Sequence, residues 1–144
     1  ENNFVILQAG KYDSTTTFTT STVRVDVPDC ALSTFEIDRP VNILVFATVE
    51  VSFTNSTTGG LSIGPDVYVY VGGDVDDVQE VRMGIHGINY RSAGFITLST
   101  HCARTISATT PPTSYDIKLQ WLVRHADDTA ALRNRQITRI KFGI

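Results

Sequence analysis

The chain has 144 residues, of which 42% are hydrophobic and 19% are charged, and its formal net charge is −3. These values are typical of one globular domain spanning 1–144, and they provide no broad cationic surface for a nucleic acid. The sequence has neither an apolar run near the roughly 20 residues of a membrane span nor a signal-peptide pattern, so we expect no membrane insertion. Because the chain begins with Glu1 rather than Met, we leave open whether further residues precede it.

Alternation of apolar and polar residues with a period of two dominates the sequence and predicts an all-β fold. The first strands are expected at 4–8 and 15–27, and Pro28 should end the second because proline lacks a backbone donor. Residues 1–14 are a candidate N-terminal arm. The longest strand is predicted at 40–53, with an unbroken apolar face: Val41, Ile43, Val45, Ala47, Val49, Val51 and Phe53.

The same alternation continues through the second half of the chain. A strand at 67–71 places three valines on one side and Tyr68 and Tyr70 on the other. Further strands are expected at 78–85, 93–100, 115–123 and 135–142, and 129–134 is the one segment that could make a helical turn. About eight short strands separated by Gly, Pro, Asp and Asn turns favour a two-sheet sandwich or jelly roll, antiparallel and without a substantial helix.

The two cysteines, Cys30 and Cys102, lie far apart, and neither has a second Cys or His at metal-ligand spacing. Two buried thiols are the favoured interpretation, and a single disulfide is the alternative. The cysteines therefore do not identify a compartment.

Patterns typical of catalysis or cofactor binding are missing from the sequence. His86, His101 and His125 lie in no recognisable nucleophile or zinc pattern, and we interpret the residues after His125 as a polar turn at a strand end. The glycine pairs at 59–60 and 72–73 lack the Lys and Ser/Thr that grip a phosphate. We therefore predict a protein that is not an enzyme and has no cofactor.

Three carboxylates in one loop, Asp74, Asp76 and Asp77, are the best candidate for a metal site, because calcium prefers oxygen ligands. The loop lacks the central glycine and the glutamate of a complete EF-hand. We favour a solvated turn and assign no metal-binding residue.

Some apolar side chains occupy strand positions that should face water. Five of them are out of phase with the core face of their own strand: Leu44, Phe46, Tyr68, Tyr70 and Leu122. A contiguous exposed apolar patch is unusual in a monomer, so we predict that these five residues contact another subunit. The alternative is that both faces of these strands pack inside one chain.

Four segments resemble, in the same chain order, strands of the C1q/TNF-like jelly-roll family. They are P-V-N-I-L-V-F-A-T-V at 40–49, R-S-A-G-F-I-T-L-S at 91–99, the strand with K-L-Q-W at 115–123, and R-Q-I-T-R-I-K-F at 135–142. The resemblance covers most of 15–142. It implies a jelly roll of about ten strands, a homotrimer, and binding rather than catalysis.

The sequence differs from animal members of this family, because it shows no collagen-like repeat, membrane anchor or signal. Its compact, Thr-rich style is similar to C1q-like domains of bacteriophage virion proteins. The resemblance therefore implies a structural protein of the virion, either a receptor-binding head on a tail fibre or spike or a capsid decoration protein.

Its partners would be other virion proteins or a host-surface glycan or protein. Receptor binding would use the loops at 74–78, 84–91 and 125–134. The alternative is a secreted ligand of a cell-surface receptor.

Overall fold

The computed structural model describes residues 5–32, 35–37, 41–54, 65–73, 79–82, 95–106 and 113–143. These ranges contain ten strands and no helix, so the all-β prediction is confirmed. The strands are β1 Val5–Asp13, β2 Thr17–Thr19, β3 Val25–Ala31, β4 Phe35–Ile37, β5 Val41–Thr54, β6 Asp66–Gly73, β7 Gln79–Arg82, β8 Ile96–Ile106, β9 Thr113–Leu122 and β10 Thr129–Gly143. No helix long and apolar enough to cross a membrane occurs in this part of the chain.

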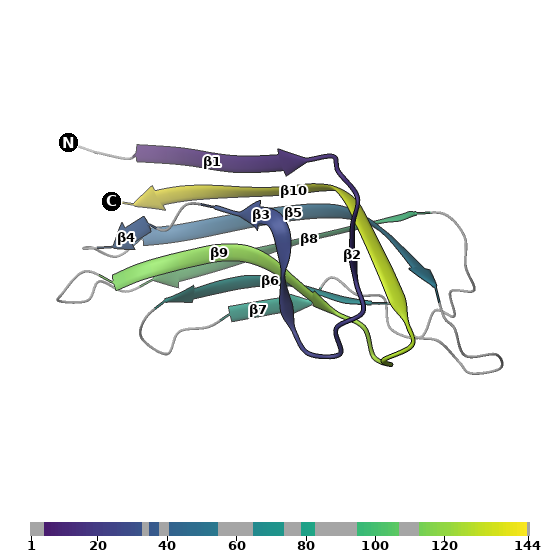
Figure 1. Ribbon diagram of the computed structural model, residues 1–144. Coiled ribbons are helices and arrows are strands. Elements are labelled where there is room, and N and C mark those ends of the chain that lie inside the picture. Colours follow the sequence, from purple (N-terminus) through teal and green to yellow (C-terminus); the bar gives the residue numbers. More distant parts are fainter. Residues whose placement is uncertain are drawn as a thin grey trace.

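Two antiparallel sheets pack face to face as a jelly-roll sandwich (Figure 1). The first sheet has the strand order β1-β10-β5-β8, and β2 also pairs with β10. The second has the order β3-β9-β6-β7, and β4 also pairs with β9. Strands that are neighbours in each sheet are therefore mostly distant in the sequence, as in the central pair of β5 and β10.

The core lies between the sheets, where the inward faces of the strands meet. Every odd-numbered residue of β5 from Val41 to Phe53 is buried, as predicted from the alternation. The second sheet contributes the valines of β6 and the buried side of β9, which carries Ile117, Leu119 and Trp121. Each large apolar side chain buried here contributes about 1.5–3 kcal/mol to folding.

The predicted strand at 15–27 is two strands that belong to different sheets. β2 pairs with β10 in the first sheet, and β3 pairs with β9 in the second, so the chain must leave one layer and enter the other between them. Val23 lies in this crossing and is 68% exposed, while Val27 is buried. The continuous valine face expected from the sequence is therefore interrupted.

Pro28 does not end its strand, contrary to the sequence prediction. β3 is at the edge of its sheet and is strongly bulged: it advances from Asp26 to Ala31 while β9 advances only from Gln120 to Lys118. A proline is compatible with an edge strand at a bulge, because no neighbouring strand needs its missing N–H. The next residue, Asp29, has a φ of 52°, in the left-handed region.

The predicted helical turn at 129–134 is also wrong, since these residues form the first part of β10. The register between β10 and β5 shifts between Arg133 and Gln136, where Asn134 has a φ of 46°. This bulge bends β10, and Figure 1 shows β2 alongside its first part and β1 alongside the rest. The bulge explains the irregular pattern that favoured a helical turn, because one extra residue breaks the alternation.

Both cysteines are buried and form no disulfide, as favoured from the sequence. Cys30 lies in β3 and Cys102 in β8, on opposite sheets. Burial raises the pKa of Cys30 to about 12 and also raises the pKa of Cys102, so both remain protonated thiols at neutral pH.

Candidate interaction surface

The outer face of the first sheet, which we call the β5 face, is defined by the even-numbered positions of β5. In antiparallel strands, directly opposed residues point to the same side of the sheet. Leu44 therefore shares this face with Ile140 of β10 and Ala103 of β8, and Phe46 shares it with His101 of β8. An apolar row thus crosses three strands of the sheet.

Exposed aromatic side chains are concentrated on the β5 face. Phe46 is 43% exposed, Tyr12 is 61% exposed and Phe18 is 66% exposed. The residues of β10 that oppose Tyr12 and Phe18 lie on the outer face, so both aromatic residues do too. Among the described residues, the other large hydrophobic side chain that is exposed is Val23, which lies outside the strands.

Polar groups lie on both sides of the apolar row, at the next outward-facing positions along the strands. On one side Phe46 meets His101, with ring centroids 6.2 Å apart and ring planes tilted by 39°. On the other side Asn42 opposes Phe142, and Thr105 donates a hydrogen bond of 2.6 Å to the Asn42 side chain. A shallow groove of about 320 Å³ lies at this second end of the row.

The charged side chains on the described strands of the β5 face neutralise each other. The Arg133 guanidinium lies 3.2 Å from the Glu50 carboxylate, and the Asn134 amide also donates to Glu50. Arg133 additionally stacks on the Phe95 ring at 3.9 Å. The pair of Glu50 and Arg133 has no net charge. On these strands, no unpaired charged side chain therefore lies beside the apolar row.

The remaining candidates, Tyr68, Tyr70 and Leu122, lie on the outer face of the second sheet, which we call the β9 face. Tyr68 opposes Gln120, Tyr70 opposes Lys118, and Leu122 opposes Asp66. The structure therefore brings these three residues together but separates them from Leu44 and Phe46 by the thickness of the sandwich. One contiguous patch cannot contain all five.

The tyrosines of the β9 face are covered by cations of the same chain. The Arg24 guanidinium lies 3.9 Å from the centre of the Tyr68 ring, and the Lys118 ammonium lies 5.1 Å from that of Tyr70. A Cβ at Gly72 would overlap the Tyr70 ring, so a larger residue there would require that ring to move. Cation–π contacts of this kind satisfy the aromatic faces without a second subunit.

Asp26 holds the charged layer of the β9 face in place. It accepts a hydrogen bond of 2.8 Å from Gln120 and pairs with Lys118 at 3.0 Å. The Gln120 hydrogen bond, followed by Lys118, lowers the pKa of the Asp26 carboxyl below its ordinary value. Asp66 is almost fully buried and pairs with Arg124 at 3.2 Å. The described side chains of the β9 face therefore form a polar surface that satisfies its own charges, unlike those of the β5 face.

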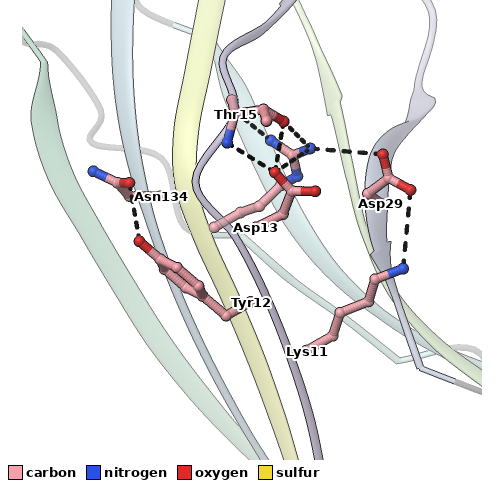
Figure 2. A network of polar contacts seen from close by, with 7 residues as sticks. Lys11, Tyr12, Asp13, Thr15, Asp29 and Asn134 are labelled. Carbon is pink, nitrogen blue, oxygen red and sulfur yellow. Dashed lines mark hydrogen bonds and ion pairs between the residues drawn. The ribbon is translucent and has the colours of Figure 1, made fainter.

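A second polar cluster surrounds Arg135, whose side chain is 1% exposed. Its guanidinium donates 2.7 Å to the backbone oxygen of Thr15 and lies 3.4 Å from Asp13 and 4.0 Å from Asp29. Figure 2 shows Asp13 and Lys11 on one side of β1 and Tyr12 on the other, where its hydroxyl donates to Asn134 at 3.1 Å.

The Arg135 cluster connects the two sheets at one edge. Asp13 belongs to β1 of the first sheet, while Asp29 belongs to the bulge of β3 in the second and also faces Lys11 at 4.0 Å. Hydrogen bonds from the hydroxyl and the backbone N–H of Thr15 lower the pKa of Asp13 below its ordinary value of 3.8. All these contacts are internal, so we assign the cluster to folding rather than to a ligand.

The candidates for catalysis and metal binding have little support in the described residues. His86 and the three carboxylates Asp74, Asp76 and Asp77 lie outside them, as do the loops at 74–78 and 84–91. Within the described ranges no group of three or more His, Cys, Asp or Glu side chains is placed to hold a metal. His125 is exposed in a turn closed by a 3.0 Å hydrogen bond from the backbone N–H of Asp128 to its carbonyl oxygen.

Several members of the β5 face were not predicted from the sequence. Ile140 is one of them: an odd and an even position of one regular strand segment face opposite sides, and of Ile137 and Ile140 only Ile137 is fully buried. The parity of the two positions was a usable signal. Tyr12 and Phe18 gave no such signal, because their face depends on the register with β10.

No family model matches the chain, and no curated protein matches it. Among solved structures, the chain is similar to one described as the structure of infectious bursal disease virus Gx strain, with 8% identity, a TM-score of 0.48, and coverage of 98% of this chain and 36% of that chain. It is also similar to the crystal structure of the infectious bursal disease virus VP2 subviral particle, with 8% identity, a TM-score of 0.32, and coverage of 98% of this chain and 41% of that chain. The chain spans less than half of each of these chains.

Proposed function

We propose that this protein is a structural component of a bacteriophage virion that assembles as a homotrimer through its β5 face. The virion assignment rests on the four segments that resemble the C1q/TNF-like family and on their compact, Thr-rich setting. The trimer rests on the same resemblance together with the exposed apolar surface. In this proposal the protein binds and does not catalyse.

One observation carries the assembly part of the proposal: Tyr12, Phe18 and Phe46 are exposed on the same face of one sheet. Large aromatic side chains gathered on one surface are enriched at protein interfaces, and a monomer rarely leaves such a surface uncovered. A second copy of the chain is a suitable occupant, because the face is apolar at its centre and carries a balanced ion pair. A closed symmetric assembly would cover it in every copy.

Two positions in the virion fit such a trimer: a receptor-binding head on a tail fibre or spike, and a protein that decorates the capsid. They share the buried β5 face and differ in what the outward surface contacts. The self-satisfied β9 face, with its tyrosines under cations, is available for either role.

The experiment that tests the proposal is localisation on the intact particle by electron microscopy, with an antibody fragment against this chain. We expect density in threefold clusters at the tail tip or on the shell. Absence from purified particles, together with secretion of the free protein, would contradict the virion assignment and favour a secreted ligand.

A further inference from the structure

The rim of the β5 face carries a histidine, His101, beside the exposed Phe46 ring. His101 lies on β8, the edge strand of the first sheet, directly opposite Phe46. Its ring is in contact distance of the Phe46 ring, with centroids 6.2 Å apart, and both side chains are exposed in the single chain. A partner that covers Phe46 therefore also covers one side of His101.

Among the described side chains on this face of the first sheet, no opposite charge is available to balance a proton on His101. On β5 and β10 the charged groups of this face are Glu50 and Arg133, which already pair with each other at 3.2 Å. On β8 the neighbouring positions of the same face are Ser99 and Ala103, and Arg104 points to the opposite side of the sheet. On β1 the titratable group of the face is Tyr12, whose hydroxyl donates a hydrogen bond to the Asn134 side chain.

We propose that assembly through the β5 face is reversed by mild acid, with His101 as the switch. This inference rests on the proposed function, since it concerns the same surface. A histidine gains its charge between about pH 7 and pH 5. An imidazolium beside the Phe46 ring is less favourable where a partner removes part of its hydration and supplies no carboxylate than in the free chain, where it is exposed to water. Symmetry repeats the cost in every copy, so protonation favours the separated chains.

The test is sedimentation velocity of the full chain at pH 7.5 and pH 5.5 over a range of concentrations. We expect an oligomer at pH 7.5 whose apparent dissociation constant rises at least tenfold at pH 5.5, because each copy must lose or exclude a proton to associate. His101→Gln should associate equally at both pH values, and His101→Arg should associate weakly at both. His125→Gln, a matched change in the exposed turn after β9, should behave as the unmodified chain.

The outcomes separate this inference from the proposed function. An oligomer that dissociates in acid equally with and without His101→Gln would overturn the switch alone, as would normal association of His101→Arg. A chain that is monomeric at pH 7.5 would overturn both the switch and the proposed assembly. Circular dichroism at both pH values confirms that each variant is folded, so that dissociation is not confused with unfolding.

Discussion

Arg135 is a buried arginine on the inner side of β10. Its guanidinium is 1% exposed, and its contacts go to Thr15, Asp13 and Asp29. Burying a charge is costly unless it is paired and hydrogen-bonded, and these three partners supply that compensation. Arg135 therefore holds the turn after β1 and the bulge of β3 close together, because its guanidinium contacts both.

Arg135→Met should lower the free energy of unfolding by about 2 kcal/mol or more, because the charged hydrogen bonds to Thr15 and the ion pair with Asp13 are lost while their acceptors remain. Arg133→Met is the matched control in the same strand. Its side chain is 41% exposed and pairs with Glu50 near the surface, so the expected loss is under about 1 kcal/mol. Urea unfolding measures both. Equal losses would contradict the special role of Arg135.

Acidification should reveal the contribution of Asp13 to stability. Its pKa is lowered in the folded chain by the Thr15 hydrogen bonds, with a further contribution from Arg135. A lowered carboxyl pKa gives stability that is present above the ordinary value of 3.8 and is lost as the pH falls through the folded value. The difference in unfolding free energy between the unmodified chain and Asp13→Asn should therefore shrink between pH 5 and pH 2.

Asp26 also has a lowered pKa, so it contributes to the stability that the chain loses in acid. The Asp26→Asn variant is therefore the reference for Asp13→Asn. Asp26→Asn should show its own shrinking difference, and the double variant should show the sum, since the two residues lie in separate clusters. A difference for Asp13→Asn that stays constant down to pH 2 would mean that the folded chain does not favour its charged form.

β9 illustrates how a strand divides its residues between core and surface. Ile117, Leu119 and Trp121 face the other sheet and are at most 1% exposed, whereas Lys118 and Gln120 join the charged layer of the β9 face. Leu122 continues the outer side and opposes Asp66. The strand therefore contributes to both the core and the polar outer surface.

Trp121→Ala should cost about 3–5 kcal/mol of unfolding free energy, because it leaves a large cavity among fully buried side chains. Gln120→Ala, the neighbouring position on the outer side, should cost under about 1 kcal/mol, since its hydrogen bond to Asp26 is exposed to solvent. Thermal or urea unfolding of the two variants checks the assignment of the faces. Similar costs at both positions would indicate a different strand orientation.

The sequence predicted elements with regular alternation well and irregular ones poorly. The buried face of β5 and the two sides of β6 follow directly from the period of two. The bulges at Asp29 and Asn134 were not predicted: Asp and Asn adopt positive φ more readily than other side chains, but they are also common in turns and on strand surfaces, so residue type alone does not place a bulge. Likewise, the separation of Leu44 from Leu122 depends on which sheet each strand joins, and alternation within a strand carries no information about that.

At the scale of the whole molecule, the two outer faces of the sandwich differ in chemistry. The β9 face covers its tyrosines with Arg24 and Lys118, whereas the β5 face exposes Phe46 beside Leu44. A sheet whose outer side is apolar at the centre is stable in water only when another surface covers it or when the patch stays small. This asymmetry is the physical basis for proposing assembly through one face.

The most direct test of this account compares the same substitution on the two faces. Leu44→Lys and Leu122→Lys each place a charge at a half-buried outer position, and the long lysine stem can lie along the sheet in both, so the fold should survive. Sedimentation velocity or native mass measurement should give three times 15.8 kDa for the unmodified chain and for Leu122→Lys, and a monomer for Leu44→Lys. A trimer that persists in Leu44→Lys and is lost in Leu122→Lys would contradict the account, and so would a monomer in all three.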